Sequence, residues 1–216
     1  MNPAAAQSGK TRRSRNSLSR AEILQAAGDL IREEGIQSLS MRSIANRLQC
    51  SVASPYAHFR NQEEIIRELI VEGEKRLTAE LKNARASAKG VHDQLAAIAR
   101  TYWNFAGDNR EQHKLMFNMG AGRMYRKVFP NLPTSYRVFL ETIRDGIKNG
   151  SIPYPRKMYA SIARTMWAWM YGLIVLDMED MLRLRGPEDH PIEEGIFLFQ
   201  LLLSRNLIDS RKPTID

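Results

Sequence analysis

The sequence predicts an all-α protein, in which an N-terminal three-helix helix-turn-helix head is joined by a long helix to a helical bundle. Apolar residues recur at helical spacing along most of the chain, and no segment alternates with the period of two that is typical of strands. No internal repeat appears. The 216 residues, 43% hydrophobic and 26% charged, are typical of a globular chain with one sizeable core or two small ones.

We expect three parts: a basic arm over 1–17, a head over 18–70 and a body over 71–216. The arm is small, polar and basic, which predicts disorder in the free protein. Its cations Arg12 and Arg13 have two interpretations. They belong to a solubilising tail, or to an arm that enters a minor groove or follows phosphates.

The first helix of the head begins with a capping signature, Ser19 followed by Glu22, and ends near Gly35. One face of this helix is apolar and supplies the floor on which the next two helices pack. That face is formed by Ile23, Ala27, Leu30 and Ile31.

Two short helical patterns fill 40–59 and are joined by a polar turn at Gln49 and Cys50. Ser51 is expected to cap the second helix with its hydroxyl, and Pro55 and Phe59 form that helix's apolar side. Small, hydroxyl and imidazole side chains then face outward between cations, as suits a DNA major groove. The apolar face of the first of these helices consists of Met41, Ile44, Ala45 and Leu48.

A DNA-binding surface is therefore predicted on the second helix and its flanks. Residues 1–62 carry nine Lys/Arg against four Asp/Glu, which favours a polyanionic partner. Two alternatives stay open, because Ser51 also serves as a cap alone and Tyr56 also suits packing on the first helix. The predicted DNA-binding residues are Arg12, Arg13, Arg42, Ser51, Val52, Ala53, Ser54, Tyr56, His58 and Arg60.

Asn61 and Glu64 form a second capping signature, which opens a fourth helix long enough to leave the head. We expect such a helix to act as a lever between head and body. Beyond the break at Gly90, helical patterns separated by Gly, Pro and Asn predict an all-helical bundle. They cover 91–107, 110–118, 132–148, 155–180 and 191–207.

Residues 18–70 resemble the DNA-binding head of the tetracycline-repressor (TetR) family of bacterial transcription regulators. The resemblance rests on Ala26-Ala27, Leu30-Ile31, Gly35, Met41-Arg42-x-Ile44-Ala45, Tyr56-x-His58-Phe59 and Asn61-x-Glu63-Glu64. It implies phosphate contacts from Tyr56 and His58 and a DNA contact from Arg42. Three positions depart from the family pattern: Gln49 replaces a usual Gly, and Val52 and Gln62 each replace a frequent Lys.

The body resembles, more weakly, a TetR subgroup named for a Trp-His-Gly motif, with Tyr171 at the His position. This resemblance rests on Tyr102-x-x-Phe105-Ala106, Leu115-Met116-Phe117 and Trp167-Ala168-x-x-Tyr171-Gly172-Leu173. Large apolar and aromatic residues at helical spacing are either plain core or the lining of a site for an apolar ligand with one or two hydrogen-bonding groups. The predicted ligand-binding residues are Tyr102, Phe105, His113, Met116, Phe117, Met166, Trp167, Met170 and Tyr171.

The last two helices carry more apolar surface than one small bundle covers, which predicts a homodimer with two reading helices one DNA turn apart. On the first of them this surface consists of Met170, Leu173, Ile174 and Leu176. On the second it consists of Ile196, Phe197, Phe199, Leu201, Leu202 and Leu203.

Other classes of protein are disfavoured. The histidines show no metal-ligand spacing, no phosphate loop or nucleophile elbow appears, and a single Cys forms no internal disulfide, so we expect no metal, cofactor or catalytic residue. The longest charge-free apolar run has 12 residues, against roughly 20 for a membrane span. A cytoplasmic location without a membrane partner is expected.

We therefore expect a dimeric transcriptional regulator, a repressor that binds palindromic operator DNA and is released by a small apolar or aromatic effector. Alternatives of the same fold are an activator and a ligand-independent regulator. Alternatives from other classes are a helical scaffold whose basic head contacts RNA or protein, and a helical enzyme. A preference for specific promoter DNA distinguishes the DNA-binding regulators from the scaffold and the enzyme, which are expected to show none.

Overall fold

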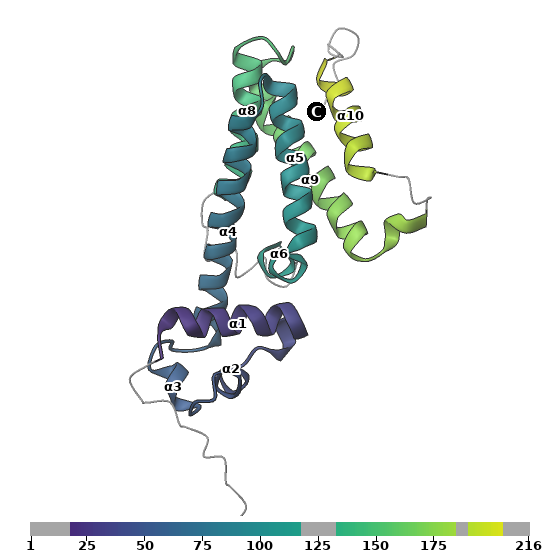
Figure 1. Ribbon diagram of the computed structural model, residues 1–216. Coiled ribbons are helices and arrows are strands. Elements are labelled where there is room, and N and C mark those ends of the chain that lie inside the picture. The colour runs from purple at the N-terminus through teal and green to yellow at the C-terminus, as the bar shows by residue number, and fades with distance from the viewer. Residues whose placement is uncertain (1–17, 118–132, 185–189, 205–216) are drawn as a thin grey trace, which may run out of the picture. The chain divides into compact units, whose positions relative to one another are not determined.

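The computed structural model describes residues 18–117, 133–184 and 190–204, and these residues form helices without strands (Figure 1). The chain divides into two compact units, Met1–Leu69 and Ile70–Asp216, called here the head unit and the body unit. The predicted all-α class is confirmed. The predicted basic arm, including Arg12 and Arg13, lies outside the described residues.

The head unit is built from α1 (Arg20–Glu34), η1 (Ile36–Ser38), α2 (Met41–Arg47), α3 (Ala53–Tyr56) and the first turns of α4 (Gln62–Ser87). α1 begins with the predicted capping box: the Ser19 hydroxyl accepts from the Glu22 N–H at 3.2 Å, and the Glu22 carboxylate accepts from the Ser19 N–H at 2.8 Å. The unit has one apolar core. Its buried side chains include Ile23, Ala27, Leu30, Ile31, Met41, Ile44, Ala45, Phe59, Ile65 and Leu69.

The turn between α2 and α3 depends on a residue in the left-handed region. Gln49 has a φ of 52°, its N–H donates to the Asn46 carbonyl at 3.1 Å, and the Cys50 N–H donates to the Ala45 carbonyl at 3.0 Å. This pair of bonds is a Schellman motif, which usually places Gly at the position of Gln49. Gln49 therefore adopts the turn geometry that Gly usually takes, and its side chain adds steric strain there.

The predicted Ser51 cap is wrong. Val52 occupies the N-cap position of α3, without a side-chain cap bond. The Ser51 carbonyl oxygen accepts from the Ser54 N–H at 2.9 Å, and this bond uses the donor that a capping hydroxyl needs. The Ser51 hydroxyl lies 2.8 Å from the Ser54 hydroxyl instead.

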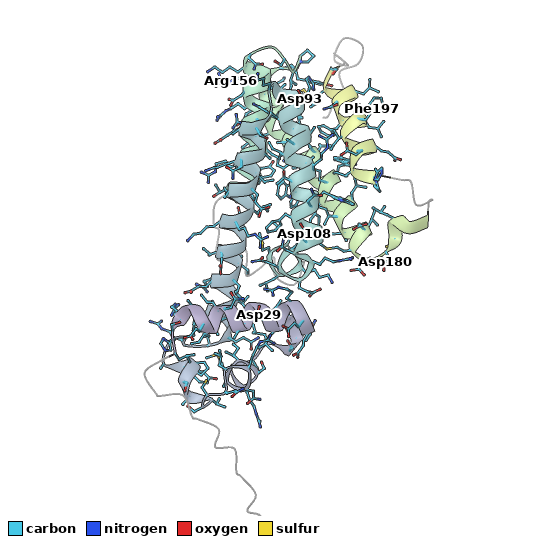
Figure 2. All side chains as sticks on the ribbon, viewed as in Figure 1. Asp29, Asp93, Asp108, Arg156, Asp180 and Phe197 are labelled. Carbon is cyan, nitrogen blue, oxygen red and sulfur yellow. The ribbon has the colours of Figure 1, made fainter. Side chains whose placement is uncertain are left out.

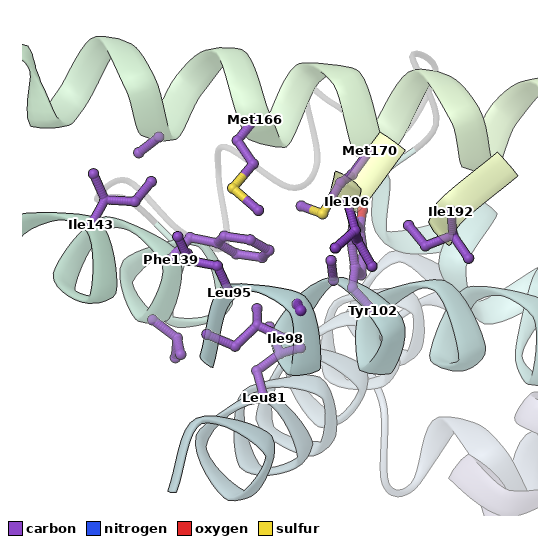
Figure 3. Packing of buried hydrophobic residues seen from close by; sticks show 14 of the residues in the cluster. Leu81, Leu95, Ile98, Tyr102, Phe139, Ile143, Met166, Met170, Ile192 and Ile196 are labelled. Atoms are coloured by element: carbon purple, nitrogen blue, oxygen red, sulfur yellow. The ribbon is translucent and has the colours of Figure 1, made fainter. Parts of the chain in front are cut away.

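The body unit contains the rest of α4 and the remaining helices. α5 is its central element, because it packs against α6, α8, α9 and α10. Figure 3 shows Met166 and Met170 of α9 pointing toward Phe139 of α8 and Tyr102 of α5 in this core. The elements are α5 (Val91–Asp108), α6 (Arg110–Phe117), α8 (Thr134–Lys148), η2 (Arg156–Met158), α9 (Tyr159–Met178), η3 (Met181–Leu184) and α10 (Pro191–Ser204).

The single helix predicted over 155–180 is η2 followed by α9. α9 ends at Met178, where the Arg110 guanidinium donates to the Met178 carbonyl at 2.8 Å and Asp180 turns the chain with a φ of 57°. The predicted helix ends at 118, 132 and 205–207 lie outside the described residues. Within the described residues, no helix has the length and apolarity needed to cross a bilayer.

Candidate functional site

The reading segment, Val52–Arg60, presents one apolar side inward and the rest outward. Pro55 is buried and Phe59 is 1% exposed, as predicted. Tyr56 is 53% exposed and Val52 is 45% exposed. Because Tyr56 and Val52 take no part in the core of the head unit, their side chains are available to contact a binding partner.

The other predicted DNA-binding residues of the head unit lie on or beside this segment. Ser51, Ala53 and Arg60 are exposed, whereas Ser54 and His58 are half-buried. Arg42 is exposed in the first turn of α2, which packs against α3. The structure thus places the candidates of 42–60 on α2, on the short helix α3 and on the segments that flank α3.

Within the body unit, several predicted ligand-binding residues meet in an interior cluster formed by Tyr102, His113, Phe117, Trp167 and Tyr171. The Tyr102 hydroxyl lies 3.1 Å from His113 Nε2, and the Tyr102 ring stacks on Trp167 with centroids 4.8 Å apart. The His113 ring lies 4.9 Å from Phe117 and 6.1 Å from Tyr171. α5, α6 and α9 therefore combine to build one aromatic cluster, in which Tyr102 and His113 are buried and the other three rings are half-buried.

The remaining candidates, Phe105, Met116, Met166 and Met170, are buried in the same core. A buried side chain at a packed position supports the core whether or not a ligand contacts it. Sequence spacing alone does not separate the two roles.

The interior cluster is uncharged at neutral pH. Burial lowers the pKa of His113 to about 4, so its imidazole is neutral. Burial, with smaller contributions from Tyr171 and Glu74, raises the pKa of Tyr102 well above its usual value. Tyr171 donates its hydroxyl hydrogen to the Phe117 carbonyl at 3.1 Å. The hydrogen-bonding groups of the cluster are therefore uncharged, and they bond to one another or to the backbone.

One buried charge of the body escaped the sequence analysis. Glu74 of α4 is 2% exposed, and its carboxylate accepts from the Ser135 N–H at 2.8 Å and the Ser135 hydroxyl at 3.0 Å, at the start of α8. These donors and the positive end of α8 stabilise the buried anion. No sequence signal marks it, because Glu74 follows Glu72 on a helix with many solvated charges.

An apolar surface is exposed on the last helices, but only part of the predicted set lies on it. Leu176, Phe197, Leu201 and Leu202 are exposed, whereas Met170, Ile174, Ile196 and Leu203 are buried because they pack into the body core. Phe197 is 64% exposed and points outward from α10 in Figure 2, while Ile196 and Leu203 of the same helix are buried in the body core. This helix is thus apolar on both its inner and its outer side. The outer residues of this surface are Val175, Leu176, Met181, Phe197, Leu198, Leu201 and Leu202.

His, Cys, Asp and Glu do not gather into a group of three or more suited to a metal ion anywhere in 18–117, 133–184 and 190–204.

Solved structures share this fold. A protein with unknown function from Rhodococcus sp. RHA1 is 24% identical with a TM-score of 0.73, covering 92% of this chain and 100% of its own. The TetR-family regulator PfmR from Thermus thermophilus is 20% identical with a TM-score of 0.61, and the match covers 84% of this chain and 96% of PfmR. The regulator FadR from Bacillus subtilis, in complex with stearoyl-CoA, is 14% identical with a TM-score of 0.66, and the match covers 86% of this chain and 98% of FadR.

A search of functionally curated proteins gave no match. Two family models do match. Residues 23–69 match bacterial regulatory proteins of the tetR family, and residues 95–196 match the tetracyclin repressor-like C-terminal domain. Neither description names the Trp-His-Gly subgroup, so that resemblance stays a prediction. Because these models together span more than half of the chain and agree with its fold, the chain belongs to the TetR family of bacterial transcription regulators, which join an N-terminal DNA-binding domain to a C-terminal ligand-binding domain.

Proposed function

We propose that the chain is a ligand-responsive repressor that binds a palindromic operator as a homodimer and is released by a small uncharged effector. The observation that carries this proposal is the reading segment, whose apolar side is buried while Tyr56 and Val52 stand in solvent. An exposed aromatic hydroxyl beside small side chains suits phosphate and base-edge contacts in a major groove. The proposed contacts come from Arg42, Ser51, Val52, Ala53, Ser54, Tyr56, His58 and Arg60.

We assign DNA binding to 18–70, effector binding and dimerisation to 71–216, and a DNA-contacting basic arm to 1–17. The arm adds Arg12 and Arg13 to the contact set through counterion release. α4 belongs to both units, since it runs from Gln62 to Ser87 across their boundary. A continuous helix is suited to carry a conformational difference from one unit to the other.

A second copy of the chain is the proposed partner of the outer apolar surface on α9, η3 and α10. Exposed patches of large apolar residues usually mark an interface, and a two-fold axis lets the same patch cover itself. A symmetric dimer presents two reading segments, which matches a palindrome with half-sites about 34 to 36 Å apart.

The interior cluster supports an uncharged apolar or aromatic effector. Among the side chains of the body that the structure describes, the only buried charged group is the Glu74 carboxylate, and no Lys or Arg is buried. An anionic effector meets no buried cation there, whereas an apolar molecule with one hydrogen-bonding group fits the Tyr102 and His113 pair. FadR, a structural neighbour, binds stearoyl-CoA, so this fold accommodates a ligand with a long apolar chain in another protein, although the CoA group of that ligand is anionic.

Release follows from linkage between the two sites. An effector that prefers the conformation with misplaced reading segments lowers operator affinity by the same factor by which operator lowers effector affinity. The ring-to-ring contacts inside the cluster favour one second candidate, a ligand-independent regulator of the same fold. That protein keeps the aromatic interior closed and binds DNA constitutively.

The test titrates the purified chain against the DNA upstream of its own gene, with mixed-sequence DNA as competitor. The proposal predicts a clear preference for the upstream DNA, whereas scaffold and enzyme hypotheses predict none. A panel of uncharged aromatic and aliphatic compounds, added to the bound complex, then separates the two candidates. Release by a compound supports the effector proposal, and persistence of the complex throughout the panel favours the ligand-independent regulator.

A further inference from the structure

Arg20, the first residue of α1, joins three segments of the head unit. Its Nη2 donates to the Glu64 carboxylate at 2.9 Å, its Nε donates to Glu68 at 3.2 Å, and Nη2 also bonds Glu68. Nη1 donates to the His58 carbonyl oxygen. The guanidinium carbon lies 4.0 Å from the centroid of the Phe59 ring. One side chain thus contacts the end of the reading segment and the first two turns of α4.

The Glu64 carboxylate extends this network to the next residue of the chain. It accepts from the Arg60 N–H at 2.8 Å while it binds Arg20. Each of three consecutive residues therefore makes a contact with this network. The His58 carbonyl oxygen accepts a hydrogen bond from Arg20, the Phe59 ring stacks on the Arg20 guanidinium, and the Arg60 N–H donates to Glu64. These residues directly follow the exposed Tyr56 and Ala57.

The network depends on the shape of a guanidinium. Its planar fork presents five donors in fixed directions and stacks on an aromatic face, whereas a Lys ammonium is a point charge that does neither. The side chains of Arg20, Glu64 and Glu68 are 42%, 30% and 35% exposed, and ion pairs with that much solvent contribute little to stability. We therefore expect the network to matter more for the orientation of the backbone at 58–60 than for the stability of the head unit.

We infer that Arg20 is a positioning residue, which fixes the direction of the reading segment relative to α1 and α4 without contacting DNA itself. This inference rests on the proposed DNA binding by that segment. Arg20 does not serve as a phosphate contact, because two carboxylates already neutralise its charge and their surplus negative charge repels a phosphate. A phosphate contact and a positioning residue differ in their effects on specificity and on salt dependence.

The test compares the full-length chain with its R20K, R20M and E68Q variants. Each is titrated against a selected operator and against mixed-sequence DNA over a range of salt concentrations. R42M is the matched control, since Arg42 is an exposed cation proposed to contact DNA. Circular dichroism and the thermal midpoint are measured for every variant, and R20K keeps the charge at this position should R20M fail to fold.

Positioning predicts that R20K, which keeps the charge, loses about tenfold or more in operator affinity, the order of magnitude of one misplaced base contact, while its mixed-sequence affinity and salt slope hold. R20M loses at least as much operator affinity with an unchanged salt slope. R42M instead lowers both affinities and flattens the slope by about one. E68Q lowers the ratio of operator to mixed-sequence affinity, although it removes a negative charge.

Unchanged operator affinity in folded R20K and R20M overturns the inference. So does a parallel loss on both DNAs with a flatter salt slope, which makes Arg20 a phosphate contact, and so does an unchanged or raised affinity ratio in E68Q. A wild-type chain that shows no preference for any operator rejects the proposed function itself, and that result is reached before any variant is measured.

Discussion

Two tyrosines show how differently the head and body units use their side chains. Tyr56 of the reading segment is 53% exposed, whereas Tyr102 of the interior cluster is 0% exposed. In the head unit, the core and the candidate contact residues are separate sets of residues. In the body unit, most of the candidate ligand-binding residues are themselves buried, and Phe117, Trp167 and Tyr171 are half-buried beside them. Function and stability should therefore be separable by mutation in the head unit and coupled in the body unit.

Trp167→Ala should give the largest effect, because the Trp167 ring is surrounded by Tyr102, Phe117, Tyr136 and Phe139 at centroid distances of 4.8 to 6.0 Å. Because the Trp167 side chain is half-buried, its removal takes away part of the packing against the core and should cost about 2 kcal/mol of unfolding free energy. Urea denaturation measures this loss, and Trp167→Phe is the control with a smaller cost. A loss below about 0.5 kcal/mol contradicts the contribution of the Trp167 ring contacts to the stability of the body unit.

The pH dependence of the unfolding free energy tests the burial of His113 in the core of the body unit. Burial lowers its pKa from 6.5 to about 4 in the folded chain, so the unfolded chain takes up a proton first as the pH falls. Unfolding free energy should drop by about 2 kcal/mol from about pH 7 to about pH 5 through this one group. His113→Gln, which stays neutral, should remove that drop in urea titrations. An equal drop in the variant assigns the pH dependence to other groups.

Tyr56→Ala should show the opposite behaviour in the head unit. Operator affinity should fall about tenfold, equivalent to about 1.4 kcal/mol, while unfolding free energy changes by less than about 0.5 kcal/mol. Fluorescence anisotropy with labelled operator and urea denaturation measure the two quantities. Tyr56→Phe, which keeps the ring, separates the hydroxyl from the ring contribution. Unchanged affinity in Tyr56→Ala removes this residue from the interface.

Gln49→Gly should give the smallest effect, in the favourable direction. Gln49 holds the left-handed position of the Schellman motif, where a side chain is strained and Gly is not. The variant should gain about 0.5 kcal/mol in unfolding free energy, because relief of strain exceeds the added freedom of the unfolded chain. Gln49→Ala, which keeps a Cβ, should show no gain. Equal stability in both variants contradicts the strain at this turn.

Much of the fold was predictable because its signals are local. The Ser19 and Glu22 box, the break at Gly90 and the apolar spacing along α5 each depend on residues a few positions apart. The Ser51 cap was predicted wrongly, because a backbone bond to its carbonyl competes with the hydroxyl, and residue preferences do not reveal which forms. The start of α4 is capped as predicted by Asn61, whose side-chain oxygen accepts from the Glu64 N–H at 3.0 Å.

The parts of the candidate sites that escaped prediction depend on contacts between distant residues. Arg20 meets Glu68 across 48 positions, and Glu74 meets Ser135 across 61. Nothing in the spacing of either pair predicts the contact, and a single charged residue on a helix is most often solvated. The aromatic residues of the body were predicted as a set, but only the fold shows that Tyr102 pairs with His113 and stacks on Trp167.

The central claim is that two copies of the reading segment, held together by the body units, grip one duplex at successive turns. Selection of bound DNA from a random-oligonucleotide pool by the purified full-length chain tests it most directly. The account predicts enrichment of an inverted repeat whose half-site centres lie about 10 base pairs apart. Enrichment of a single, unrepeated site, or of no sequence at all, would contradict it.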